Sequence, residues 1–195
     1  MINQIHLKQY GAGIFIMKKK TEHILAEKTN VMRVLDQKKI EYKHYSYADT
    51  DAISGMDVAE ALGKDPAQAF KTLVTVGKSG QHYVFVVPVY KELDLKKAAA
   101  AVGEKNIEMI KSKELLPLTG YIHGGCSPIG MKKLFKTTFD ISALDFETVF
   151  FSGGKIGYSV EVSPTDIQRS YRFSLRILQD KPGEINEAKK YTGLG

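Results

Sequence analysis

The residues best suited to chemistry form a glycine-rich stretch near the middle of the chain. It runs from Gly124 to Lys133 and reads GGCSPIGMKK. Glycine can adopt positive φ and lets a ligand approach the main chain, and proline fixes the turn that follows. The N–H and C=O groups of such a loop could hold a small polar ligand, and the lysines that end it favour a ligand carrying phosphate. Glycine clusters also build tight turns, so these residues alone leave a binding loop and a structural turn as alternatives.

Lys71 is the second candidate, because it follows Phe70 and opens the apolar run Lys71-Thr72-Leu73. An ammonium group beside an apolar strand is costly unless it reaches solvent or a ligand. A surface lysine that extends into solvent and a functional cation both satisfy this condition.

Other catalytic chemistries find little support in the sequence. A nucleophilic Cys126 would need a neighbouring base or cation to lower the pKa of its thiol, and only His123 is near in sequence, so Cys126 is expected to pack. Ser127 has no identifiable His/Asp pair, and the glycine loop lacks the GK[ST] ending of a nucleotide-binding P-loop. The five histidines have no metal-ligand spacing. We therefore expect neither a metal nor a cofactor.

The composition is that of one globular domain of 195 residues, with 43% hydrophobic and 26% charged residues. The net charge of +6 favours a polyanionic partner. A single cysteine excludes an intramolecular disulfide and fits a reducing compartment. The apolar run Ile14–Met17 is too short for a membrane span, and its lysines follow it, which is the wrong order for a secretory signal. We expect a cytoplasmic protein that does not associate with membranes.

Periodicity, capping residues and turn residues predict hairpins interspersed with helices, which indicates an α+β fold with a mixed sheet. Residues Ser54 and Asp57 form a capping-box pattern, and Ser112 is expected to cap a helical turn that stops at Pro117. Helices are expected at about 29–39, 54–63, 94–103, 112–117 and from 163 onward, and strands at 40–47, 72–76, 83–87, 107–110, 148–151 and 156–162.

Four motifs in order resemble the YbaK/EbsC family of free-standing aminoacyl-tRNA deacylases, which are related to the editing domain inserted in bacterial prolyl-tRNA synthetases. They are FKTL at 70–73, LDLKK at 93–97, TGYIHGGCSPIGMKK at 119–133 and FSGGKIG at 151–157. The resemblance covers residues 29–170, which leaves residues 1–28 as an N-terminal extension and 171–195 as a C-terminal tail. It implies a single domain with a strongly curved, partly barrel-like sheet surrounded by helices.

The resemblance also implies roles for individual residues. Lys71 would be the central functional cation, in contact with the aminoacyl ester or the terminal ribose. Ser159 stands where family enzymes that act on cysteinyl-tRNA tend to have an aspartate. The residues implied in substrate binding are Tyr47, Gly124, Gly125, Cys126, Ser127, Pro128, Gly154 and Ser159, and those expected to hold tRNA phosphates are Lys132, Lys133, Lys136 and Lys155.

The implied activity is hydrolysis of a mischarged aminoacyl-tRNA in trans, with cysteine or another small amino acid on tRNA(Pro) as the substrate. The implied partner is the aminoacylated acceptor end of tRNA, and prolyl-tRNA synthetase is a second candidate partner. A non-catalytic module that binds aminoacyl-tRNA or a nucleotide remains the alternative, since the same loop and lysines would serve it.

Overall fold

Side-chain caps fix the first helices of the computed structural model, which describes residues 28–179. The hydroxyl of Thr29 accepts a hydrogen bond at the start of α2 (Asn30–Gln37). The predicted capping box is present at α3 (Gly55–Ala61), where Ser54 accepts from the N–H of Asp57 and the Asp57 carboxylate accepts from the N–H of Ser54. These starts are local in origin, which is why the sequence predicts them.

The same logic holds for two later helices. Asp94 caps α4 (Leu95–Val102), and Gly103 ends it with φ at 83°, in the left-handed region that glycine adopts without strain. Ser163 caps α6 (Pro164–Tyr171), whose first residue is a proline, as expected for a helix N-terminus. Both predictions are confirmed.

The prediction for α5 was wrong at both ends. Lys111 is the N-cap residue and Ser112 is the first helical residue of α5 (Ser112–Thr119). The helix continues past Pro117, because a proline near the end of a short helix removes only one main-chain hydrogen bond. It ends at Gly120, which has φ at 83°.

Among the described residues, one sheet has the strand order β1-β7-β6 and is antiparallel throughout. Its strands are β1 (Tyr42–Ser46), β6 (Val149–Ser152) and β7 (Tyr158–Val162). The β6–β7 hairpin predicted from the sequence is confirmed.

The second sheet of the described region has the order β4-β2-β3-β5-β8. The antiparallel β2–β3 hairpin matches its prediction, whereas β5, parallel to both β3 and β8, and β8 itself were not predicted. The strands are β2 (Phe70–Gly77), β3 (His82–Pro88), β4 (Ile107–Met109), β5 (Lys136–Asp140) and β8 (Ser174–Arg176).

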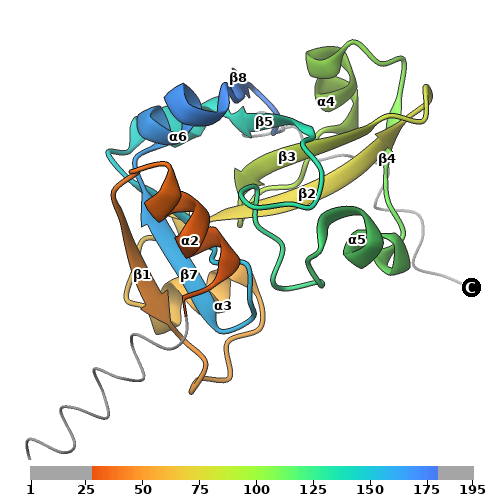
Figure 1. Ribbon diagram of the computed structural model, residues 1–195. Coiled ribbons are helices and arrows are strands. Elements are labelled where there is room, and N and C mark those ends of the chain that lie inside the picture. Colours follow the sequence, from red (N-terminus) through yellow and green to blue (C-terminus); the bar gives the residue numbers. More distant parts are fainter. Residues whose placement is uncertain (1–27, 180–195) are drawn as a thin grey trace, which may run out of the picture.

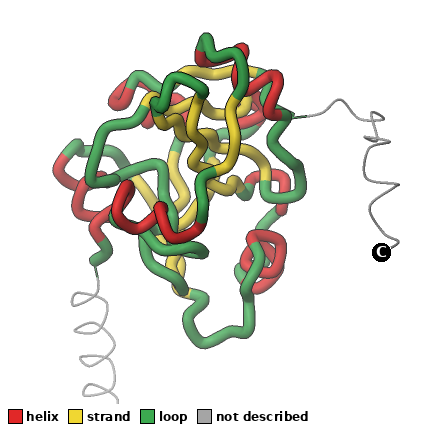
Figure 2. Tube along the Cα trace, turned by 90° about the vertical axis from the view of Figure 1, so that its right-hand side faces the viewer, coloured by secondary structure: helices red, strands yellow, loops and turns green. Residues whose placement is uncertain are grey.

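The α+β class and the mixed strand directions are confirmed, and the strands lie at the centre of the molecule with helices at its periphery (Figures 1 and 2). The strands form two sheets and not one closed surface. A parallel bridge between Ala69 and Phe150 joins them. Short 3-10 helices, η1 (Pro66–Gln68) and η2 (Ile141–Asp145), complete the connections. The barrel-like character is therefore limited to the curvature of two linked sheets.

The main core contains side chains from both sheets and from α2. Phe70 and Val74 of β2 meet Phe151 of β6 and Val160 of β7 there, with Leu35 of α2 packed against them. A smaller cluster on the other face of the β2–β3 hairpin packs against α4. The two faces of β2 are thus buried by different partners. Neighbouring side chains of β2 therefore point into different surroundings.

The folded part extends beyond residue 170, where the family resemblance ends. β8 pairs with β5, and Leu178 is fully buried. The carboxylate of Asp140, itself fully buried, accepts hydrogen bonds from the main-chain N–H of Leu178 at 2.7 Å and from Nε2 of Gln179 at 3.0 Å. The sequence assignments for residues 1–27 and 180–195 lie outside the described residues.

Candidate functional site

A cavity of about 480 Å³ lies where the predicted motifs converge. Its walls come from β2, from the loop after α5, from the β6–β7 sheet and from the start of α3. Cavities of this size are typical of small-molecule sites. Its apolar lining includes Phe70, Leu73, Val74, Ile110, Leu115 and Phe151, and its polar or titratable lining includes Tyr47, Ser54, Lys71, Thr72, His123, Cys126, Ser152 and Ser159.

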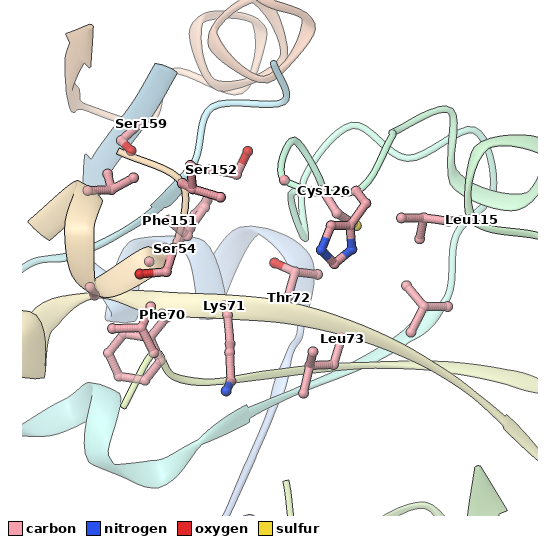
Figure 3. Close-up of a pocket in the computed structure, with 18 of the residues that line it drawn as sticks. Ser54, Phe70, Lys71, Thr72, Leu73, Leu115, Cys126, Phe151, Ser152 and Ser159 are labelled. Carbon is pink, nitrogen blue, oxygen red and sulfur yellow. The ribbon is translucent and has the colours of Figure 1, made fainter. Parts of the chain in front are cut away.

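Hydroxyl groups dominate the polar part of the cavity, as Figure 3 shows for Ser54, Thr72, Ser152 and Ser159. No aspartate or glutamate is among the described residues that line it. Ser159, which lines the cavity, is only 3% exposed, and the buried hydroxyl of Thr72 has no hydrogen-bond partner within residues 28–179. The cavity can therefore offer uncharged donors and acceptors to a ligand, but no countercharge to a cationic group.

Lys71 lies at the edge of this cavity, and its ammonium group is turned away from the glycine loop. Nζ lies 3.3 Å from Oε1 of Glu92, whose side chain is 77% exposed. Figure 3 shows Lys71 on the opposite side of β2 from Thr72 and Cys126. Because side chains alternate along a strand, Thr72 shares the face of β2 that carries Phe70 and Val74. An exposed ion pair of this kind contributes at most about 1 kcal/mol, so little energy holds the ammonium there.

The glycine loop is held by close main-chain packing against the β6–β7 turn. A Cβ atom on Gly125 would lie 3.3 Å from the main-chain nitrogen of Ile156, so only glycine fits without displacement. The Tyr121 hydroxyl donates to the carbonyl of Ile129 at 2.6 Å and fixes the far end of the loop. Gly124 has φ at 81° and lines the cavity.

The structure brings part of the predicted substrate-binding set to the cavity. Tyr47, Gly124, Cys126 and Ser159 line it, as does Lys71.

The other predicted residues serve the loops instead of the cavity wall. The buried Ser127 accepts a hydrogen bond from the N–H of Ile129, at 3.4 Å. Gly154 is required by packing, because a Cβ atom there would lie 2.7 Å from Cγ2 of Val31. Direct contact with a ligand in this cavity is therefore not supported for Gly125, Ser127, Pro128 and Gly154.

Cys126 lines the cavity, as does His123. Burial raises the pKa of its thiol to about 12. A group with this pKa is almost entirely protonated at neutral pH, and the thiol form is a poor nucleophile.

None of the four lysines proposed to hold phosphates lines the cavity. Lys136 donates to the carbonyl of Val102, at the end of α4, over 3.3 Å. Nζ of Lys155 lies 5.1 Å from the centre of the Tyr158 ring, beside the β6–β7 turn. Lys132 and Lys133 are exposed in the segment that follows the glycine loop.

Several cavity residues were not selected from the sequence: Thr72, Ser54, Ser152 and His123. Alternation along β2 could have shown that Lys71 and Thr72 point to opposite faces. Nothing in the sequence indicated which face would meet the glycine loop. Within residues 28–179, no group of three or more His, Cys, Asp or Glu residues is placed to hold a metal ion, and no helix is long and apolar enough to cross a bilayer.

An ionic network lies on the same face of the three-stranded β1-β7-β6 sheet, here called the small sheet, as Ser159. The carboxylate of Glu161 accepts from the Tyr45 hydroxyl, from Thr148 at 2.7 Å and from the Lys64 ammonium at 3.0 Å. Burial alone would raise the pKa of Glu161, but the hydrogen bonds from Tyr45, Thr148 and Lys64 outweigh it and lower the pKa to about 2. The network ties β7 to the segment that follows α3.

Comparison with known proteins agrees with this arrangement. Residues 51–170 match the model of the "Aminoacyl-tRNA editing domain" family. A relative from Enterococcus faecalis (strain ATCC 700802 / V583), named "Putative Cys-tRNA(Pro)/Cys-tRNA(Cys) deacylase EbsC", is 47% identical over 151 residues, which is 77% of this chain and 90% of the relative.

Solved structures share the fold. The crystal structure of "a putative trans-editing enzyme for prolyl tRNA synthetase" superposes with a TM-score of 0.68 at 25% identity, covering 78% of this chain and 96% of that one. A hypothetical protein at 20% identity gives a TM-score of 0.73 and covers 78% of this chain and all of its own. The resemblance seen in the four sequence motifs is confirmed: the chain belongs to the aminoacyl-tRNA editing domain family.

Proposed function

We propose that this protein hydrolyses the ester bond of mischarged aminoacyl-tRNA in trans, with Cys-tRNA(Pro) as the first candidate substrate. The similarity to the E. faecalis deacylase over most of both chains is the observation that carries the proposal. The convergence of three sequence motifs on one cavity supports that cavity as the site of the proposed activity.

The reaction asks little covalent chemistry of the protein. An aminoacyl ester is already activated, so positioning and stabilisation of charge on the carbonyl oxygen can supply most of the acceleration. Lys71 is the proposed source of positive charge: its pair with the exposed Glu92 is weak enough for the ammonium to exchange it for a ligand. Gly124 and Ser159 are the proposed contacts to the aminoacyl group.

A cysteine substrate can provide its own nucleophile. Its thiol would lose a proton and attack the ester carbon, and the bond to the ribose oxygen would break as that oxygen takes up a proton. Cysteine would leave in cyclised form and then be hydrolysed by water. This route fits a cavity whose only cysteine among the described residues, Cys126, has a pKa near 12.

The proposed partner is the acceptor end of tRNA, which the net charge of +6 would attract. Lys132 and Lys133 follow the glycine loop directly and are the first candidates for phosphate contacts, with Lys155 at the neighbouring turn. Prolyl-tRNA synthetase is the proposed protein partner, and the cytoplasm is the proposed place of action.

A binding module without catalysis is the second candidate, favoured by one observation: the cavity has Ser159 and no carboxylate among its described lining residues. A deacylation panel of Cys-, Ala-, Ser- and Pro-tRNA(Pro) with Cys-tRNA(Cys) separates the two. Turnover of the mischarged species with Pro-tRNA(Pro) spared supports editing. Tight binding of the same species without turnover supports the module.

A further inference from the structure

Thr72 carries one of the few buried polar atoms of the described region that has no hydrogen-bond partner. Within residues 28–179, these side-chain atoms are Oγ1 of Thr72, Oγ1 of Thr138 and the hydroxyl of Tyr171. Thr72 alone among the three lines the cavity. Buried hydroxyl groups normally find a partner, because leaving one unpaired destabilises the fold.

The surroundings of Thr72 would suit an apolar side chain of the same shape. On its face of β2 the neighbours are Phe70 and Val74, and its partner across the sheet is the fully buried Val86 of β3. A valine would fill this position without an unpaired hydroxyl. A ligand bound in the cavity would supply the hydrogen-bond partner that the Thr72 hydroxyl lacks.

The direction of the side chain points to the occupant. Figure 3 shows Thr72 rising from β2 toward the side where Cys126 and Ser152 lie, while Lys71 leaves the strand on the other side. The apolar core residue Phe151 also lies on the Thr72 side. Thr72 is thus the polar residue that the middle of β2 presents to the space between the glycine loop and the small sheet.

We infer that the Thr72 hydroxyl donates a hydrogen bond to the carbonyl oxygen of the bound aminoacyl ester, an inference that rests on the proposed deacylase function. A carbonyl oxygen only accepts, and the Thr72 proton has no acceptor within the described protein. Negative charge develops on this oxygen when the ester is attacked, so the bond strengthens in the transition state. Thr72 contributes to the rate of the reaction more than to the affinity for tRNA.

The test compares two isosteric changes. Thr72→Val removes the hydroxyl in the cavity, and Thr138→Val removes the matched unpaired hydroxyl on β5, which is fully buried and outside the cavity. Both variants should melt at or above the wild-type temperature, because each loses an unsatisfied group. We expect kcat on Cys-tRNA(Pro) to fall by about 10²-fold in Thr72→Val and to stay unchanged in Thr138→Val. Thr72→Ser, which keeps the hydroxyl, should recover most of the rate.

The outcomes separate the inference from the proposed function. A wild-type protein that hydrolyses no aminoacyl-tRNA of the panel overturns the function and the inference together. An active wild type with an equally active Thr72→Val overturns the inference alone. A Thr72→Val variant with raised KM and unchanged kcat also overturns it, because the hydroxyl would then bind the ground state and the transition state equally.

Discussion

Two polar residues on one face of β7, Glu161 and Ser159, have opposite surroundings. Glu161 is 8% exposed, and its carboxylate accepts hydrogen bonds from Tyr45, Lys64 and Thr148. Ser159 lies two residues earlier, is 3% exposed, and lines the cavity. The first position joins secondary-structure elements, and the second is left open toward a cavity. Polar groups whose hydrogen bonds are made within the fold hold this sheet together, and polar groups that face the cavity are where a ligand is expected.

This contrast predicts that changes at the cavity remove activity and leave stability, with Lys71→Ala as the largest case. Lys71 carries the only charged Lys, Arg, Asp or Glu side chain among the described residues that line the cavity, so its loss should lower kcat/KM by about 10²–10³-fold. Deacylation kinetics and thermal unfolding of the same sample provide the two readouts. Glu92→Gln is the control, because it removes the partner of Lys71 while its own exposed side chain lies outside the cavity lining; its activity should match wild type. Wild-type turnover by Lys71→Ala would mean that the ammonium stays outside the reaction.

Changes at Glu161 should show the reverse pattern. Glu161→Gln leaves the Lys64 ammonium, whose side chain is 27% exposed, without its countercharge and should lower the free energy of unfolding by about 2–3 kcal/mol. Activity well below the melting temperature should be unchanged. Asp36→Asn, which breaks the exposed pair between Lys28 and Asp36, should lower the free energy of unfolding far less than Glu161→Gln does. Urea unfolding measures the loss of unfolding free energy in both variants. Equal losses would mean that the Glu161 network stabilises the fold no more than an exposed ion pair does.

The pH dependence of that stability difference gives an independent check. The pKa of Glu161 is lowered to about 2 in the folded protein from its ordinary value of 4.5, so the folded state favours the ionised form. Its contribution is fully present above about pH 4.5 and is lost as the pH falls toward 2. The gap in unfolding free energy between wild type and Glu161→Gln should therefore shrink over this interval. A gap that is constant with pH would mean that the carboxylate charge is not what stabilises the network.

A smaller effect is expected at Cys126, which lines the cavity but offers it only a protonated thiol. Cys126→Ser should keep kcat within a few-fold of wild type, because burial raises the pKa of the thiol to about 12 and no thiolate is available at neutral pH. Single-turnover deacylation is the measurement. A loss as large as that of Lys71→Ala would reveal a nucleophile that the geometry does not indicate.

The smallest expected effect is on the salt dependence of tRNA affinity, and it concerns lysines that lie away from Ser159 and Glu161 in the sequence. Replacing Lys132 and Lys133 by alanine should reduce the slope of log affinity for tRNA against log salt by roughly 0.7–0.9 for each phosphate that a lysine no longer neutralises. Lys136→Ala should leave the slope unchanged, since that ammonium binds the carbonyl of Val102 at the end of α4. Filter binding at several salt concentrations distinguishes these results. An unchanged slope in the double variant would place the tRNA elsewhere on the surface.

Features that the sequence predicts correctly depend on neighbours in the chain. The capping box of Ser54 and Asp57, the cap at Asp94 and the β2–β3 hairpin each need only a few consecutive residues. β5 and β8 escaped prediction because their parallel pairing joins segments far apart in sequence, and β5 carries four consecutive buried residues instead of an alternating pattern. Short buried runs of this kind cannot be assigned by periodicity.

The residues of the candidate site also fall into those that the sequence predicts and those that depend on the assembled fold. Family motifs led to Lys71, Gly124 and Ser159, which all line the cavity. The choice between Lys71 and Thr72 depends on which face of β2 the small sheet covers, and this is a property of the assembled fold. The packing roles of Gly125 and Gly154 likewise arise from contacts with Ile156 and Val31, which lie at least thirty positions away along the chain.

The buried carboxylate of Asp140 determines where this protein can be shortened. Two of its donors, the N–H of Leu178 and the amide of Gln179, lie beyond residue 170, the last residue matched by the family model. A fragment trimmed at that boundary would keep every residue that lines the cavity, yet it would lose strand β8 and leave an anion in the interior with only Ser142 to solvate it. Expression of a chain that ends at residue 170 should therefore give aggregated or proteolysed material, whereas a chain that ends after residue 179 retains both donors. At the C-terminal end, the family boundary and the folding boundary of this chain differ by about one strand.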